Sequence, residues 1–135
     1  MILTDAGPRV AIIDRGDPDH EACVAAIHSL HGPMVTIWPA FTEAMYLLGR
    51  GGWPAQSQLW RLLLSGRVQL AEPEETPIER MAELMERYGD HPMDLADASL
   101  VALAETRDLR QVFTLDRDGF HSYRLRGRRH FQVVP

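Results

Sequence analysis

The segment "PMDLADASLVALAE", residues 92–105, decides the fold of this chain. Its apolar residues recur at helical spacing, which predicts a helix packed into the core. Two aspartates, Asp94 and Asp97, stand in the first turn, three residues apart and therefore on one face. Acidic residues favour this position because they accept hydrogen bonds from free amides and face the positive end of the helix dipole, so Asp94 is a candidate N-cap with Asp97 at N3. A capping role and a functional role both remain open for this pair.

On both sides of this segment, short apolar stretches alternate with helical patterns. Such alternation is typical of a parallel sheet with helices on both faces, so we expect an α/β/α three-layer sandwich with a central, mainly parallel sheet. We find no linker, repeat or low-complexity tract, and predict a single domain over residues 1–135. Strands are predicted within 1–5, 33–37, 68–72, 111–116 and 130–134, and the other helices within 8–15, 16–32, 38–52, 54–66 and 76–90.

Two helix starts are predicted in detail. Asp17 is the candidate N-cap of the second helix, with Pro18 at its first position. Thr76 and Glu79 match the spacing of a capping box at the start of the helix that follows the acidic loop.

Composition excludes several classes of site. All 14 basic residues are arginine, so chemistry that needs a lysine, such as a P-loop, a Schiff base or a phosphorylation-type receiver domain, is disfavoured. The lone Cys23 excludes an internal disulfide and a multi-cysteine zinc site, and is expected in the core. The start lacks the pattern of a signal peptide and no apolar run is long enough to span a membrane, so we expect a cytoplasmic protein.

Carboxylates are predicted to gather at one edge of the sheet. Asp5 and Asp116 end two strands, and ligands of parallel sheets bind at the carboxyl ends of strands. The helix that begins at Asp94 runs back to the start of the strand before Asp116, so its first turn lies at the same edge. Glu43 is a further candidate, in a helix whose other residues are mostly apolar. The negative charges of these carboxylates would repel one another unless a hard divalent cation such as Mg²⁺ were bound. A metal site of this kind can hydrolyse a phosphodiester.

These residues carry a resemblance to a known family. The segments "ILTDAGP", "WPAFTEAMYLL", "MDLADASLVALAE" and "VFTLDRDGF" are similar, in that order, to the motifs of PIN-domain proteins of the VapC toxin type. The resemblance implies a PIN-like fold over residues 1–135 and a metal-dependent endoribonuclease. It assigns catalytic roles to Asp5, Glu43, Asp97 and Asp116, metal binding to Asp5, Asp97 and Asp116, and outer-shell roles to Asp94, Thr114 and Asp118.

The resemblance further implies Mg²⁺ or Mn²⁺ as cofactor, RNA as substrate, an antitoxin protein as partner, and a homodimer. Two positions depart from the family pattern. Ala6 stands where a threonine or serine commonly follows the first aspartate, and Gly119 looks like an insertion in the usual ending. Ala6 keeps open an alternative, in which a catalytically weakened PIN-like module only holds a protein partner.

Three further features allow two readings each. Arg124, Arg126, Arg128 and Arg129 form a basic patch that either contacts RNA phosphates or is a solvated loop before the last strand. Trp53 and Trp60 belong to an apolar cluster that is either core or an exposed face for a partner. His28 and His31 lie one helical turn apart, but no third ligand is evident, so surface positions are expected.

Overall fold

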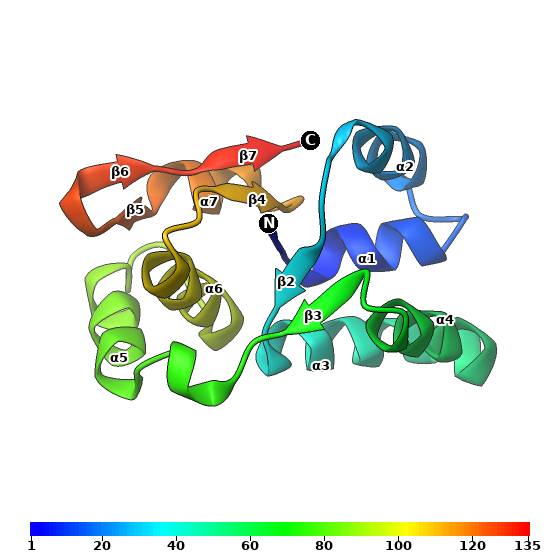
Figure 1. Cartoon of the computed structure of the whole chain (residues 1–135), viewed down its shortest axis with the longest axis horizontal. Helices are drawn as coiled ribbons and strands as arrows, with labels where there is room; N and C mark the ends of the chain where they lie inside the picture. Colours follow the sequence, from blue (N-terminus) through cyan, green and yellow to red (C-terminus); the bar gives the residue numbers. More distant parts are fainter.

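The computed structural model describes all residues, 1–135, and is built on a five-stranded sheet with the strand order β3-β2-β1-β4-β7 (Figure 1). Every neighbouring pair in this sheet is parallel. The predicted central parallel sheet is therefore confirmed. Its strands are β1 (Ile2–Thr4), β2 (Met34–Thr36), β3 (Val68–Leu70), β4 (Gln111–Phe113) and β7 (Gln132–Val134).

Helices cover both faces of the sheet, as Figure 1 shows, with α1 to α4 on one side and α5 and α6 on the other. This confirms the α/β/α sandwich. None of the helices has the length and apolar character that a membrane span requires. The helices are α1 (Ala6–Ile13), α2 (His20–Ser29), α3 (Trp38–Leu48), α4 (Gly52–Leu64), α5 (Ile78–Arg87), α6 (Leu95–Arg107) and α7 (Arg117–Ser122), and the short 3₁₀ turns are η1 (Gly49–Gly51), η2 (Pro73–Glu75) and η3 (Arg126–Arg128).

Side chains of the strands alternate between two apolar clusters. Ile2 of β1 packs toward α1 and α2, in a cluster that includes the buried Cys23. Leu3, the next residue, packs in the larger cluster around α6. Both faces of the sheet are thus covered, which explains why every residue of β1 and β2 is buried.

Helix α6 is the central helix of the larger cluster. Every residue from Ala96 to Ala104 is buried. Its start is a capping box: Oδ1 of Asp94 accepts from the backbone N–H of Asp97 at 2.8 Å, and Oδ2 of Asp97 accepts from the N–H of Asp94 at 3.2 Å. The predicted N-cap at Asp94 and N3 position of Asp97 are confirmed.

Several element boundaries were predicted wrongly. Helix α1 begins at Ala6 and not at Pro8, because the Asp5 side chain accepts from the N–H of Ala6 at 2.8 Å and caps the helix there. Helix α2 has Asp19 and not Asp17 as its N-cap residue. Asp17 instead accepts from the N–H of Asp19 at 2.8 Å, which forms a turn before the helix.

The capping box predicted at Thr76 and Glu79 is also wrong. The hydroxyl of Thr76 donates to the carbonyl of Pro73 at 3.0 Å and is not available as a cap. The box lies one turn earlier, in η2, where Glu72 and Glu75 cap each other. Helix α5 itself begins after Pro77 without a side-chain cap.

The chain end contains a hairpin that was not predicted. Strands β5 (Arg124–Leu125) and β6 (Arg129–His130) pair antiparallel, joined by η3, in a sheet of their own. The last strand of the main sheet therefore begins at Gln132, two residues later than expected. Gly127 makes the tight turn possible, because its φ of 77° lies in the left-handed region.

Candidate active site

Asp5 and Asp116 meet at the carboxyl edge of the sheet through a shared threonine. Asp5 follows β1 and Thr114 follows β4, its neighbour in the sheet, and both side chains are buried. The Thr114 hydroxyl donates to Oδ2 of Asp5 at 3.0 Å and accepts from the backbone N–H of Asp116 at 3.0 Å. One buried hydroxyl thus positions both segments that carry the strand-end aspartates.

Asp97 reaches the same region from the first turn of α6. Its Oδ2 accepts from the phenol hydroxyl of Tyr123 at 3.3 Å in addition to the N–H of Asp94. Tyr123 is buried and packs edge-to-face against Phe120 and Tyr88. No sequence pattern marks Tyr123 as part of a site, because only the packing of α7 and β5 against α6 brings it to Asp97.

Burial and nearby negative charges make the carboxyl groups of Asp97 and Asp5 hard to ionise. Burial, and then the charge of Asp94, raise the pKa of Asp97 to about 7, with smaller contributions from Asp5 and Asp116. Burial also raises the pKa of Asp5, against the hydrogen bonds from Ala6 and Thr114, and Asp94 and Asp116 act in the same direction as burial. The four aspartates therefore lie close enough to influence one another electrostatically.

Glu43 faces this group from α3. Its side chain is exposed at the surface. Burial of part of the carboxyl raises the pKa of Glu43, and so do the negative charges of Asp5 and Asp94. The structure thus brings together Asp5, Asp94, Asp97, Asp116 and Glu43, with Thr114 beneath them.

Asp118 is not part of this group. It lies exposed in α7, and its carbonyl accepts from the hydroxyl of Ser122. Asp116 caps α7 with Oδ1, which accepts from the N–H of Gly119 at 3.1 Å. A Cβ atom on Gly119 would overlap the Asp116 carboxylate. The glycine that looked like an insertion therefore makes room for the carboxylate of Asp116.

The donor set suits a hard cation, although its present arrangement is not that of a complete ligand set. No three acidic, histidine or cysteine side chains converge as ligands of one ion. One oxygen each of Asp94, Asp97 and Asp116 is used in a helix cap. The second oxygens of Asp97 and Asp116 accept no hydrogen bond from the protein. Carboxylate oxygens, two of them without a protein partner, are the donors that Mg²⁺ or Mn²⁺ prefers.

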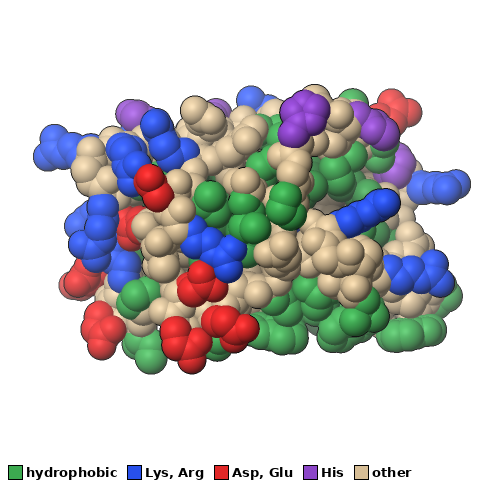
Figure 2. Space-filling view, in the orientation of Figure 1, with side chains coloured by type: hydrophobic (Ala, Val, Ile, Leu, Met, Phe, Trp, Pro, Cys, Tyr) green, Lys and Arg blue, Asp and Glu red, His purple; other side chains and the backbone are tan.

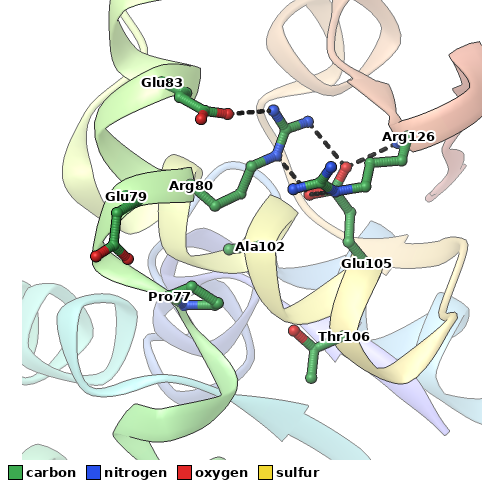
Figure 3. Close-up of a pocket in the computed structure, with 8 residues that line it drawn as sticks. All are labelled: Pro77, Glu79, Arg80, Glu83, Ala102, Glu105, Thr106 and Arg126. Atoms are coloured by element: carbon green, nitrogen blue, oxygen red, sulfur yellow. Dashed lines mark hydrogen bonds and ion pairs between the residues drawn. The ribbon is translucent and has the colours of Figure 1, made fainter.

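The arginine patch lies at the other end of α6. The backbone N–H of Arg126 donates to Glu105 at 2.7 Å, and Glu105 also binds the guanidinium of Arg80 (Figure 3). Arg129 pairs with Asp108 at 2.7 Å. Glu105 lies about 12 Å along the helix axis from the level of Asp97, given 1.5 Å per residue. The patch is thus not adjacent to the carboxylates.

The other two arginines of the patch make no ion pair. Arg124 donates to the carbonyls of His121 and Tyr123. It directly follows Tyr123, whose hydroxyl binds Asp97, so it is the arginine of the patch that lies nearest in sequence to a residue of the acidic group. Arg128 is exposed in the turn of the hairpin. The stretch predicted to be either a phosphate-binding patch or a solvated loop is therefore a hairpin whose arginines are partly committed to internal contacts.

The predicted tryptophan cluster is divided between core and surface. Trp60 is half-buried and packs against Phe41, with ring centroids 5.1 Å apart. Trp53 is 66% exposed. Trp60 thus packs against the core and Trp53 lies on an exposed face, and the use of that face by a partner stays a prediction. His28 and His31 are exposed, as expected.

Comparison with known proteins places the chain in a family. The model of the PIN domain matches residues 2–125. Ribonuclease VapC26 of Mycobacterium tuberculosis is 32% identical over 135 residues, which cover 99% of this chain and 100% of that protein.

Two solved structures share the fold at lower identity. The first is Mycobacterium tuberculosis VapC20, described as a sarcin-ricin loop cleaving toxin, with a TM-score of 0.73, 20% identity, and coverage of 87% of this chain and 92% of that one. The second belongs to a toxin–antitoxin complex from Klebsiella pneumoniae, with a TM-score of 0.69, 19% identity, and coverage of 100% and 97%. Since the family model spans nearly the whole chain and VapC26 matches it end to end, the chain belongs to the PIN domain family and, within it, to the VapC-type proteins.

Proposed function

We propose that this chain is a metal-dependent endoribonuclease that hydrolyses RNA phosphodiester bonds, and that it is the toxin of a toxin–antitoxin pair. The observation that carries the proposal is the gathering of Asp5, Asp97 and Asp116 at one sheet edge, where burial and mutual repulsion raise the pKa of Asp97 to about 7. A bound cation relieves the repulsion between these carboxylates and so favours their ionised forms. The end-to-end similarity to Ribonuclease VapC26 supports the same activity.

In this proposal Asp5, Asp97 and Asp116 hold Mg²⁺ or Mn²⁺. When bound, the metal supplies charge neutralisation at the phosphodiester and lowers the pKa of a water molecule. Glu43, which is exposed beside the group and has a raised pKa, takes up a proton from the attacking water. Asp94 and Thr114 are assigned to supporting positions around these ligands, and Asp118, which lies exposed in α7, is left out of the site.

The supporting residues hold the acids in place. Thr114 fixes the orientation of Asp5 and the start of the segment that carries Asp116. Tyr123 donates to Asp97 and so stabilises its ionised form once repulsion is relieved. These contacts are buried, which limits rotation of the carboxylates before substrate binds.

The proposal also assigns surfaces that contact RNA, an antitoxin and a second copy of the chain. We assign phosphate contacts to Arg124, Arg126, Arg128 and Arg129, which would serve a substrate long enough to reach from the acidic group to the hairpin. An antitoxin and a second copy of the chain would use exposed apolar surface on α3 and α4. We expect the protein to act on cellular RNA in the cytoplasm.

A catalytically weakened binding module is the second candidate. Two observations favour it: Ala6 lacks the hydroxyl common in the family at that position, and no three acidic side chains are arranged as ligands of one ion. Such a module would bind a protein partner and leave RNA intact.

Cleavage assays separate the two candidates. The purified chain is expected to cleave single-stranded RNA with Mg²⁺ or Mn²⁺ and to stop when EDTA is added. Asp97→Asn and Asp116→Asn are expected to lose cleavage, whereas Asp90→Asn, an exposed acid in the turn before α6, keeps it.

Growth measurements test the proposal even if the enzyme cleaves only a specific cellular RNA and not generic single-stranded RNA. Expression of the chain alone is expected to slow growth and to produce new RNA ends, and Asp97→Asn to do neither. Equal growth of both strains with unchanged RNA would overturn the ribonuclease and favour the binding module.

A further inference from the structure

A pocket lies at the edge of the sheet opposite the acidic group. It has a volume of about 550 Å³ and opens where the chain enters β2 and β3, between α1, α2 and α4. Gly32 and Gly66 shape its mouth: both have positive φ, and a Cβ atom on either would meet nothing within 4 Å. Because the strands are parallel, their amino ends lie away from the edge that carries Asp5 and Asp116. This pocket is therefore separate from the proposed active site.

Arg9 is the unusual residue of this pocket. It comes from α1, is 4% exposed and lines the cavity. The guanidinium donates a single hydrogen bond, from Nη2 to the thioether Sδ of Met34 at 3.4 Å, and its Nε has no partner. A thioether is a weak acceptor, so a cation buried in this way lacks the anion that would offset its desolvation.

Asp5 does not fill this role. It is the acidic group that acts on Arg9 electrostatically, but no hydrogen bond joins the two side chains. The carboxylate oxygens of Asp5 accept instead from the N–H of Ala6 and the hydroxyl of Thr114. The charge of Asp5 thus lowers the free-energy cost of burying the Arg9 guanidinium. Asp5 accepts no hydrogen bond from that guanidinium.

The remaining wall is apolar or positive. Ile12, Ile27 and Leu62 are among the apolar side chains that line it, and the charged residues of the lining are Arg9 and Arg67, with no acid among them. Figure 2 shows hydrophobic side chains open to solvent between histidines over α2 and arginines nearer α4. A ligand that matches this wall carries a negative charge on an apolar body.

We propose that this pocket binds a small amphipathic monoanion, a carboxylic acid with an apolar tail, whose carboxylate pairs with the guanidinium of Arg9. Arginine suits this role because its planar donors match a carboxylate in a two-point contact. The volume lies within the range of small-molecule sites, roughly 300–1,000 Å³. The tail packs on Ile12, Ile27 and Leu62.

Octanoate, octan-1-ol and acetate are suitable probes. Calorimetric titration of the full chain in EDTA, which keeps metal out of the acidic site, is expected to show a single octanoate bound. Octanoate should bind at least about tenfold more tightly than octanol, since hydrogen bonds to charged groups are worth about 1.5–3 kcal/mol. Acetate lacks the tail and is expected not to bind measurably. Methyl NMR signals of Ile12 and Ile27 should shift with octanoate.

Variants test the assignment to Arg9. Arg9→Met keeps an unbranched, flexible side chain without the charge, and is expected to fold with a melting temperature no lower than wild type, because it removes a buried cation without a partner. Its affinity for octanoate should fall to that for octanol. Arg67→Met, at the exposed rim, should bind octanoate like wild type.

Ile27→Trp narrows the cavity and leaves Arg9 unchanged, so it tests the proposal even if Arg9→Met fails to fold. It is expected to lose octanoate binding. Equal affinity of wild type for octanoate and octanol, unchanged octanoate binding by Arg9→Met or by Ile27→Trp, or competition by acetate alone, which indicates an adventitious ion only, would each overturn the proposal. None of these outcomes depends on ribonuclease activity.

Discussion

At the scale of single residues, Thr114 connects two members of the acidic group, Asp5 and Asp116. Its hydroxyl is buried, donates to Asp5 and accepts from the N–H of Asp116. Thr36 has the same side chain in another buried position, at the end of β2, but its hydroxyl has no hydrogen-bond partner. The two threonines therefore form a matched pair.

Thr114→Val is expected to lower the free energy of unfolding by about 1–3 kcal/mol, because the N–H of Asp116 and a carboxylate oxygen of Asp5 lose a buried partner. Thr36→Val should be neutral or stabilising, since it removes an unpaired buried hydroxyl. Urea denaturation of both variants measures the difference. Equal effects would mean that the Thr114 hydrogen bonds contribute nothing net. Metal-dependent cleavage should fall only in Thr114→Val.

Asp97 should make stability depend on pH. Its pKa in the folded chain is about 7, above its ordinary value of 3.8, so the folded state holds a proton that the unfolded state releases between these values. The free energy of unfolding therefore decreases as pH rises from about 4 to about 7 in the absence of metal. Asp97→Asn should remove this contribution, and melting curves at several pH values in EDTA measure it. Parallel pH profiles of the two proteins would show that Asp97 ionises normally.

At the scale of elements, one buried ion pair connects α5 to α6. Arg80 and Glu105 meet at 2.8 Å with side chains 8% and 7% exposed, and Glu83 binds the same guanidinium from the exposed side (Figure 3). The backbone N–H of Arg126 also donates to Glu105, so the hairpin depends on the same carboxylate. Glu105 thus holds three segments together at the end of α6 remote from Asp97.

Glu105→Ala is expected to cost about 3–5 kcal/mol, because it leaves the buried guanidinium of Arg80 without its main partner. Glu83→Ala should cost no more than about 1 kcal/mol, since that carboxylate is mostly exposed and screened by solvent. Chemical denaturation of both variants provides the comparison. A cost for Glu105→Ala as small as that for Glu83→Ala would show that α5 and α6 are held by apolar packing alone.

At the scale of the whole molecule, exposed apolar side chains gather on α3 and α4. Tyr46 is 81% exposed, Trp53 66% and Leu64 83%. Large apolar residues in such number on neighbouring helices are typical of a surface that a partner covers. This is the face that we assign to self-association and to the antitoxin.

Trp53→Glu is expected to fold with the wild-type melting temperature and to sediment at a lower mass than wild type, because it places a charge in the contact surface alone. Trp60→Glu should lose stability, since Trp60 is half-buried against Phe41. A wild-type chain that sediments as a monomer, or a Trp53→Glu variant with wild-type mass, would contradict the assignment to self-association.

The sequence by itself determined the layers and the edge at which the acids gather. Apolar runs separated by helical patterns leave few alternatives to a parallel sheet between helices, and the chain direction then places Asp5, Asp97 and Asp116 at the carboxyl edge. The capping box of Asp94 and Asp97 was predictable because caps depend on residues close in sequence. The catalytic and metal-binding roles of these acids remain predictions.

Only the tertiary structure decided the contacts between segments far apart in the sequence. Tyr123 beside Asp97, Thr114 beneath Asp5 and the buried Arg9 against Met34 each arise from packing of separate elements. The hairpin also brings Arg126 and Arg129 to the end of α6 that is remote from Asp97. The spacing of residues in the sequence predicts one helix or strand at a time. Burial and side-chain pairing depend instead on how these elements pack against one another, and the free energy of packing is a property of the whole chain.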